Sequence, residues 1–221
     1  CYDGCIEVDL SQIDCMMALP YHPSNAIPIR EFKADPAKYL AEVEAEGNKI
    51  KDGRGKPFHI MDKLKADGLH IDQALVSGCA GGMFENLSAM ADILDGCALP
   101  GNGPFLGINP ASQPVYLDAM RQGIADTLTL AGVVIRGAIC GPCFGVSDIP
   151  ADNQLSIRHV TRNYPNREGS KPGGGQMAAT ILMDARSIAA TVRNCGVLTA
   201  ADELDVTYTP RRHHFDPTIY Q

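Results

Sequence analysis

A chain of 221 residues with 45% hydrophobic and 20% charged residues is long enough to bury one substantial core and has the composition of an ordinary globular domain. Its net charge of −7, without any basic block, argues against nucleic acid or an anionic membrane as a partner. No apolar run approaches the roughly 18 residues of a membrane span, and no signal peptide is visible. In a chain of this size the eight cysteines favour metal binding and free thiols over a disulfide framework, so we expect a cytoplasmic protein.

The two ends of the chain indicate a piece of a longer protein. The first residue is not Met, and the chain stops at Ile-Tyr-Gln. No sequence repeat or clear domain break interrupts it, so we expect one domain over residues 1–206. The last stretch, 207–221, contains two prolines and is interpreted as the start of a linker toward a further C-terminal domain.

The N-terminal third predicts few regular elements. We expect a strand over residues 6–10 and an extended surface segment over 18–28, which contains three prolines. Asp35 followed by proline is typical of a helix start, and Gly47 is predicted to end that helix. A second, short helix is expected over residues 57–66.

From residue 70 onward strands and helices alternate. Strands are predicted over residues 70–77, 104–109, 132–136 and 155–161. Helices are predicted from Phe84 to a stop at Gly96, from Ser112 through Leu128 with Met120 on the apolar face, and from Asp184 to a stop at Gly196. This alternation predicts an α/β fold, a three-layer αβα domain with a mainly parallel sheet.

Three cysteines and two arginines occupy turns that follow the predicted strands. Cys79 lies in Ser-Gly-Cys-Ala-Gly-Gly, and Cys140 and Cys143 form a Cys-Gly-Pro-Cys turn in which both thiolates can face one metal. Arg162 and Arg167 lie beyond the strand predicted over 155–161. Because α/β folds place their sites at the carboxyl ends of parallel strands, the sequence predicts a soft-metal site beside an anion site.

The order and spacing of these motifs resemble the third domain of the aconitase family. The matching stretches are S-G-C-A-G-G with F-E-N-L, then C-G-P-C-F-G, then T-R-N-Y-P-N-R-E-G. V-D-L-S with P-Y-H-P-S-N at the beginning and F-D-P-T-I-Y at the end resemble that domain's two boundaries, so the resemblance spans nearly the whole chain.

The resemblance implies a 4Fe-4S cluster held by Cys79, Cys140 and Cys143. With only three cysteine ligands, one iron keeps an open position and can act as a Lewis acid on a substrate hydroxyl. Arg162 and Arg167 match the arginines that bind substrate carboxylate in this family. The implied activity is dehydration and rehydration of a hydroxy di- or tricarboxylic acid.

Two positions around the implied cluster depart from the family pattern. Thr161 stands where the family usually has Asn, and Gly78-Cys79-Ala80-Gly81 replaces the usual Ser-Cys-Thr-Asn. Changed hydrogen bonding near a cluster shifts its potential or the choice of substrate, so Thr161 and Gly81 indicate a divergent branch.

The family's active site is shared among four domains. The resemblance therefore implies that the remaining domains of the same protein are this chain's partners and supply the other catalytic groups, including a serine base. We expect the isolated piece to fold, to be inactive, and to be purified without its cluster.

Other interpretations of the cysteines remain open. Cys-Gly-Pro-Cys is also the redox motif of thioredoxin, which needs its first cysteine at a helix N-terminus, whereas residues 144–150 do not favour a helix. A structural zinc site and a non-catalytic, degenerate homologue are further alternatives. Cys97 and Cys195 are expected to be small buried residues, and Cys1, Cys5 and Cys15 follow no recognisable pattern.

Overall fold

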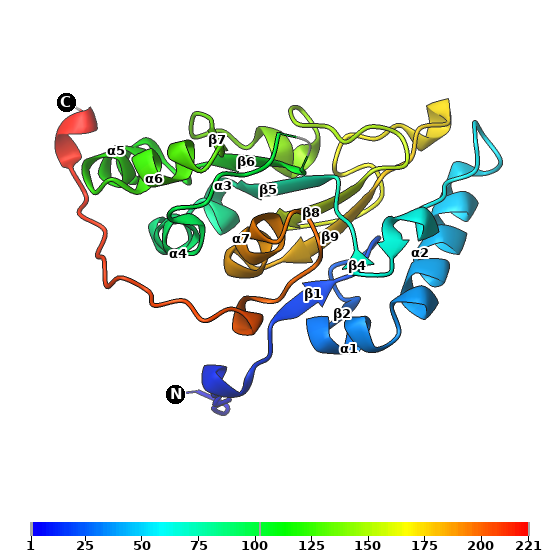
Figure 1. Ribbon diagram of the computed structural model, residues 1–221, viewed down its shortest axis with the longest axis horizontal. Coiled ribbons are helices and arrows are strands. Elements are labelled where there is room, and N and C mark those ends of the chain that lie inside the picture. The colour runs from blue at the N-terminus through cyan, green and yellow to red at the C-terminus, as the bar shows by residue number, and fades with distance from the viewer. Residues whose placement is uncertain (1, 102, 221) are drawn as a thin grey trace.

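A seven-stranded sheet forms the centre of the computed structural model, which describes residues 2–101 and 103–220 (Figure 1). Its strands are β1 (Met16–Ala18), β2 (Ala26–Pro28), β5 (Gln73–Ser77), β6 (Phe105–Asn109), β7 (Val134–Ile135), β8 (Leu155–His159) and β9 (Ala179–Met183). They lie in the order β2-β1-β9-β8-β5-β6-β7. The five strands from β9 to β7 are parallel, and β1 runs antiparallel to both β9 and β2.

In the described part of the chain, seven helices accompany the sheet. They are α1 (Ile29–Ala34), α2 (Pro36–Lys51), α3 (Gly78–Gly81), α4 (Phe84–Leu94), α5 (Gln113–Arg121), α6 (Ile124–Leu130) and α7 (Ala185–Arg193). Helices α4 to α7 pack together, with α7 against β5 and β8, while α1 and α2 lie at the β1–β2 end of the molecule (Figure 1). The predicted three-layer αβα fold with a mainly parallel sheet is confirmed.

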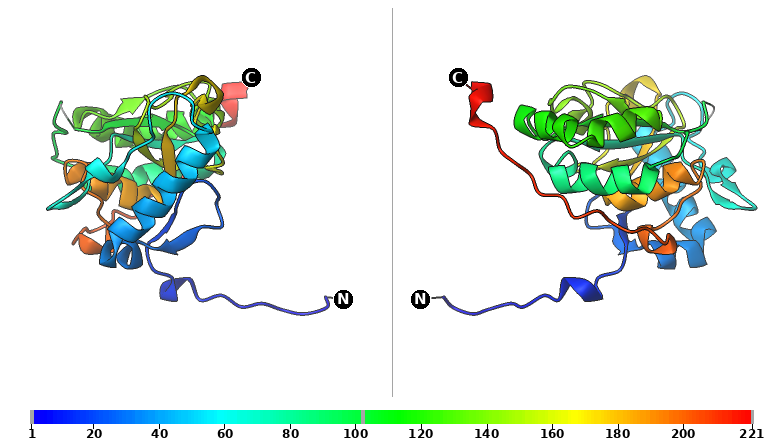
Figure 2. Two further views of the ribbon diagram at one scale, coloured as in Figure 1. Left: turned by 90° about the vertical axis from the view of Figure 1, so that its right-hand side faces the viewer. Right: turned by 60° about the vertical axis from the view of Figure 1, so that its left-hand side comes forward.

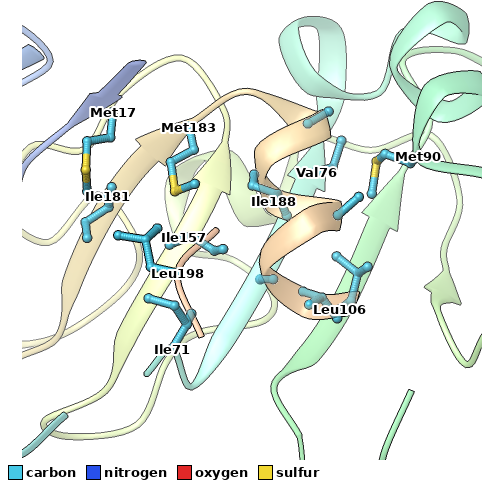
Figure 3. Close-up of a cluster of buried hydrophobic side chains, with 14 of the residues drawn as sticks. Met17, Ile71, Val76, Met90, Leu106, Ile157, Ile181, Met183, Ile188 and Leu198 are labelled. Carbon is cyan, nitrogen blue, oxygen red and sulfur yellow. The ribbon is translucent and has the colours of Figure 1, made fainter. Parts of the chain in front are cut away.

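Helix α7 illustrates how local sequence and core packing agree. The carboxylate of Asp184 accepts hydrogen bonds from the backbone N–H groups of Arg186 and Ser187, both at 2.9 Å, which satisfies the first turn. On the inner face Ile188 is fully buried. Figure 3 shows it among strand side chains that include Val76 and Ile157. Each such burial contributes about 1.5–3 kcal/mol to folding.

The prediction that Gly47 ends the helix that begins after Asp35 is wrong. Helix α2 continues to Lys51 and ends at Asp52, whose φ of 53° is left-handed. An added Cβ at Gly47 would lie 2.5 Å from both the Phe58 ring and the Tyr21 hydroxyl oxygen. The glycine therefore allows close packing in the middle of the helix.

The helix predicted over 57–66 is also wrong. A single 3-10 turn, Met61–Lys63, leads into a small hairpin of β3 (Leu64–Lys65) and β4 (Gly68–Leu69). Side chains of α2 instead tie this segment down: Asn48 accepts a hydrogen bond from the backbone N–H of Phe58 at 2.8 Å, and Glu44 accepts from those of Ile60 and Met61 at 2.9 and 3.1 Å. These contacts hold the segment against α2 in an irregular conformation.

The predicted N-terminal strand does not form either. Residues 2–13, all within the described part, are exposed, and the segment runs away from the body of the molecule with only a 3-10 turn at Leu10–Gln12 (Figure 2). The extended segment predicted over 18–28 instead contributes the edge strand β2 to the sheet. A strand needs a neighbouring strand to pair with. At this end of the sheet β1 pairs with β9 and β2 pairs with β1, whereas residues 6–10 lie outside the sheet.

The long helix expected from Ser112 is two helices. Gly123, with φ of 74°, separates α5 from α6 and re-aims the chain, which leaves Met120 48% exposed instead of on the buried face. Among the remaining cysteines, Cys195 is exposed, contrary to expectation, and Cys97 is only partly buried. Cys5 is exposed, Cys15 is partly buried, and Cys1 lies outside the described residues.

The C-terminal segment after Val206 lies along the helical layer (Figure 2). Arg211 pairs with Asp92 of α4 at 2.8 Å. Asp118 of α5 accepts hydrogen bonds from the His213 ring at 2.8 Å and from the backbone N–H of His214 at 2.6 Å. Across the described ranges, none of the helices is long and apolar enough to cross a membrane.

Candidate functional site

The Cys140–Cys143 turn lies against the turn that holds Cys79. Gly78, the residue before Cys79, has φ of 67°, and a Cβ added to it would lie 3.1 Å from the Cys143 Sγ. The same Sγ lies 3.7 Å from the carbonyl oxygen of Ser77, at the end of β5. Two sequence-predicted thiol turns, some sixty residues apart, therefore meet at the carboxyl end of the central strand.

The three thiols differ in their surroundings. Cys143 is buried, whereas Cys79 and Cys140 are exposed. Burial raises the pKa of Cys143, the nearby Cys140 and Cys79 thiols raise it further, and Ser77 and Arg158 oppose this rise. The three sulfurs thus share one electrostatic neighbourhood. Within residues 2–101 and 103–220, however, no three or more His, Cys, Asp or Glu side chains are already gathered as ligands of a metal ion.

The segment that follows Arg167 packs against Gly145, the residue that ends the Cys140–Cys143 turn. A Cβ at Gly145 would lie 2.5 Å from both N and Cα of Gly169, so the two backbones are in direct contact. Arg167, two residues earlier, has a buried Nε with no hydrogen-bond partner in the part of the chain that the structure describes. Arg162 is exposed, and its Nη1 donates to the Thr161 hydroxyl at 3.2 Å. The arginine segment thus contains one orphaned buried donor and one accessible guanidinium, and only the part that follows Arg167 contacts the cysteine loop.

Gly81 has a packing role that the sequence did not reveal. A Cβ on Gly81 would lie 2.2 Å from the carbonyl oxygen of His159, so α3 lies directly on the end of β8. The Asn usual in the family cannot be accommodated there unless the backbone shifts. Gly81 offers only backbone, and its carbonyl accepts a hydrogen bond from the Asn86 side chain at 3.0 Å.

Sequence reasoning missed Arg158 of β8, which is 1% exposed. Its guanidinium donates to the carbonyl oxygens of Pro142 at 2.8 Å and Asp148 at 3.0 Å, as well as to the side chains of Gln73 and Ser156. Burial lowers its pKa to about 10, so the side chain stays charged at neutral pH. The available signal was an arginine that directly follows the alternating apolar residues Leu155 and Ile157 in a predicted strand.

Comparison with known proteins is decisive at the level of family. A family model described as the aconitase family (aconitate hydratase) matches residues 1–190. The chain belongs to the aconitase family.

Curated relatives of this aconitase-family chain are subunits of dehydratases. It is 37% identical over 120 residues to the 3-isopropylmalate dehydratase large subunit of Mycolicibacterium smegmatis, covering 54% of this chain and 28% of the relative. With the corresponding subunit of Aquifex aeolicus it shares 26% identity over 208 residues, 92% of this chain and 40% of the relative. A probable methanogen homoaconitase large subunit of Methanothermobacter thermautotrophicus is 32% identical over 106 residues, 48% of this chain and 24% of the relative. The chain spans less than half the length of these relatives.

The Cys-Gly-Pro-Cys turn of this aconitase-family chain differs from a thioredoxin-type motif. Residues Gly141–Phe144 form a 3-10 turn that ends at Gly145 with φ of 74°, in place of an α-helix starting at the first cysteine. Without a helix dipole at Cys140, the usual cause of a reactive thiolate is missing from this described turn. In this respect the turn does not have the local geometry of a thioredoxin-type redox motif.

Proposed function

We propose that this chain is the cluster-binding part of an aconitase-family hydro-lyase that dehydrates and rehydrates a hydroxy di- or tricarboxylic acid. The observation that carries the proposal is the contact of the Cys143 Sγ with Gly78, which joins two thiol turns at the carboxyl end of the parallel strands. Relatives named as 3-isopropylmalate dehydratase and homoaconitase large subunits support the reaction class.

In this proposal Cys79, Cys140 and Cys143 hold a 4Fe-4S cluster. Thiolates are the donors that iron–sulfur clusters use, and the exposure of Cys79 and Cys140 leaves both free to turn toward a shared group. Because burial raises the pKa of Cys143, binding of the cluster must release a proton from that thiol. When bound, an open iron supplies the Lewis acid that makes the substrate hydroxyl a better leaving group.

Arg162 and Arg167 are proposed to bind the substrate carboxylates. Buried donors are nearly always hydrogen-bonded, so the orphaned Nε of Arg167 favours a ligand that supplies the acceptor. A guanidinium matches a carboxylate with two parallel hydrogen bonds. Thr161 accepts from Arg162 and so orients it, the role we propose for this departure from the family pattern.

The remaining acid–base chemistry is proposed to come from other domains of the same protein. The chain spans less than half of its curated relatives, so the proposal places a domain at 1–206, a linker start at 207–221 and the proton-transfer groups elsewhere. We accordingly expect the isolated chain to be inactive, and we expect the whole protein to work in the cytoplasm.

The proposal is tested by measuring iron and acid-labile sulfide after anaerobic reconstitution of the chain. We expect iron and sulfide in equal amounts, lost in Cys79→Ser and retained in the control Cys195→Ser, which alters an exposed thiol at the end of α7. Absence of iron from every variant, together with a reducible Cys140–Cys143 disulfide that Cys79→Ser leaves intact, would overturn the cluster in favour of thiol redox chemistry. A full-length protein that holds its cluster without turnover would instead be a non-catalytic homologue.

A further inference from the structure

Arg158 is a buried cation, and its hydrogen-bond acceptors in the described structure are uncharged. Two are backbone carbonyls, of Pro142 and Asp148, and two are side-chain oxygens, of Gln73 and Ser156, all at 2.8–3.0 Å. Removing a guanidinium from water is costly unless its donors are matched, and hydrogen bonds from a charged donor are about twice as strong as neutral ones. Such a residue is expected where a particular loop must be held in one place.

The contacts of Arg158 join a loop to the sheet. Gln73 and Ser156 lie opposite each other on the adjacent strands β5 and β8, and the Ser156 hydroxyl also donates to the Gln73 side chain at 2.8 Å. Pro142 and Asp148 lie in the loop that contains the Cys140–Cys143 turn. The Gln73 amide donates to the Asp148 carbonyl as well, at 2.9 Å. Arg158 and Gln73, two polar side chains of the sheet, therefore hold this loop at the carbonyl groups of Pro142 and Asp148.

The fastening point at Pro142 is the residue directly before Cys143. A hydrogen bond of 2.8 Å to its carbonyl fixes the orientation of the following peptide, which carries the buried Sγ to its contact with Gly78. If the turn lifted away from the sheet, Cys143 would separate from Cys79, which follows Gly78. The position of Cys143 relative to Cys79 thus depends on Arg158, which makes no hydrogen bond to either cysteine in the described structure.

We propose that Arg158 is the positioning residue of the three-cysteine site: its guanidinium holds the Pro142 carbonyl and so keeps the Cys140–Cys143 turn closed against Cys79. What the thiols bind rests on the proposed function, whereas the position of the turn does not.

Alkylation of the metal-free chain by iodoacetamide, followed residue by residue by mass spectrometry, tests the proposal. Arg158→Met keeps an unbranched apolar stem but removes every donor. Relative to the exposed Cys79, we expect alkylation of Cys143 to accelerate on the order of tenfold to a hundredfold, since a hydrogen bond from a charged group no longer holds the turn closed. Cys97, partly buried and remote in sequence, reports any global opening and should not accelerate.

Arg136→Met is the matched control on the same loop. Arg136 pairs with the Asp148 carboxylate, at 3.1 Å through its Nε, but does not contact the Pro142 carbonyl. We expect this variant to leave the rate of Cys143 alkylation within about twofold of the wild-type rate, because the hydrogen bond from Arg158 to the Pro142 carbonyl is intact. Equal acceleration in both variants would show that any loosening of the loop suffices and would overturn the role of Arg158.

Arg158→Lys keeps the test decisive if Arg158→Met does not fold. An ammonium retains the charge but cannot reproduce the guanidinium fork, so Cys143 should react faster than in the wild-type chain. An unchanged Cys143 rate in a folded Arg158 variant would refute the proposal. Because no metal is present, this result is independent of the iron content of Cys79→Ser, and the two proposals can fail separately.

Discussion

Replacing Gly81 by alanine should destabilise the protein, although alanine is the better helix former. The ideal Cβ at this position lies 2.2 Å from the His159 carbonyl oxygen, well inside the 3.0 Å that real contacts respect. That oxygen belongs to the backbone of β8, so no side chain can rotate away. Either α3 or the end of the strand must shift, and with it the turn that carries Cys79.

The size of the effect follows from two opposing contributions. Overpacking of a buried position costs about 1–3 kcal/mol. Exchanging glycine for alanine inside a helix returns up to about 1 kcal/mol. We therefore expect the free energy of unfolding to fall by about 1–2 kcal/mol. For a chain of this size that corresponds to a melting temperature roughly 2–8 °C lower.

Thermal unfolding followed by circular dichroism measures this difference, with Gly137→Ala as the control. Gly137 is exposed, and its added Cβ would meet nothing within 4 Å. That substitution should raise stability by about 0.4–1 kcal/mol, because it restricts the unfolded chain. If Gly81→Ala unfolds at the same temperature as Gly137→Ala or higher, the close approach of α3 to β8 does not limit the residue at this position.

Further predictions concern the core, pH and the C-terminal segment. Ile157→Ala removes a fully buried side chain of β8, so chemical denaturation should show a loss of about 2–5 kcal/mol. A hydrogen bond to Glu44 raises the pKa of His59 above 6.5, so the stability from this pair is present below pH 6.5 and is lost as pH rises through the raised value. Glu44→Gln should remove that pH dependence from the melting temperature, and an identical profile in both proteins would contradict it. Asp118→Asn weakens the contact with His213, so trypsin should cut the C-terminal segment severalfold faster, while an unchanged rate would mean that other contacts hold it.

Helices α4 and α7 could be predicted from the sequence because each depends on residues close together in the chain. Their apolar side chains recur at helical spacing, and Asp184 caps α7 through its own neighbours. The parallel sheet followed from the alternation of such helices with apolar strands. The cysteine and arginine motifs likewise identified the family, since their order and spacing are properties of the chain itself.

The errors occurred where a distant partner controls the local structure. Gly47 ends nothing, because Phe58 and Tyr21 pack on it inside α2. The segment 57–66 is tied to α2 by hydrogen bonds from its backbone to Asn48 and Glu44 and forms a 3-10 turn and a hairpin instead of a helix. In both cases the partner residues lie at least ten positions away in the sequence, so they cannot be recognised from the local pattern.

The sequence by itself determined the fold class, the family and the residue types available for the site. Only the tertiary structure decided that the Cys143 Sγ meets Gly78 and that Gly145 packs on Gly169. It also decided that Arg158 donates to the loop that contains Cys143. The physical reason is the range of the interactions. Helix propensity and capping act within a few residues, whereas close backbone contacts and buried hydrogen bonds form between segments that meet only after the sheet has assembled.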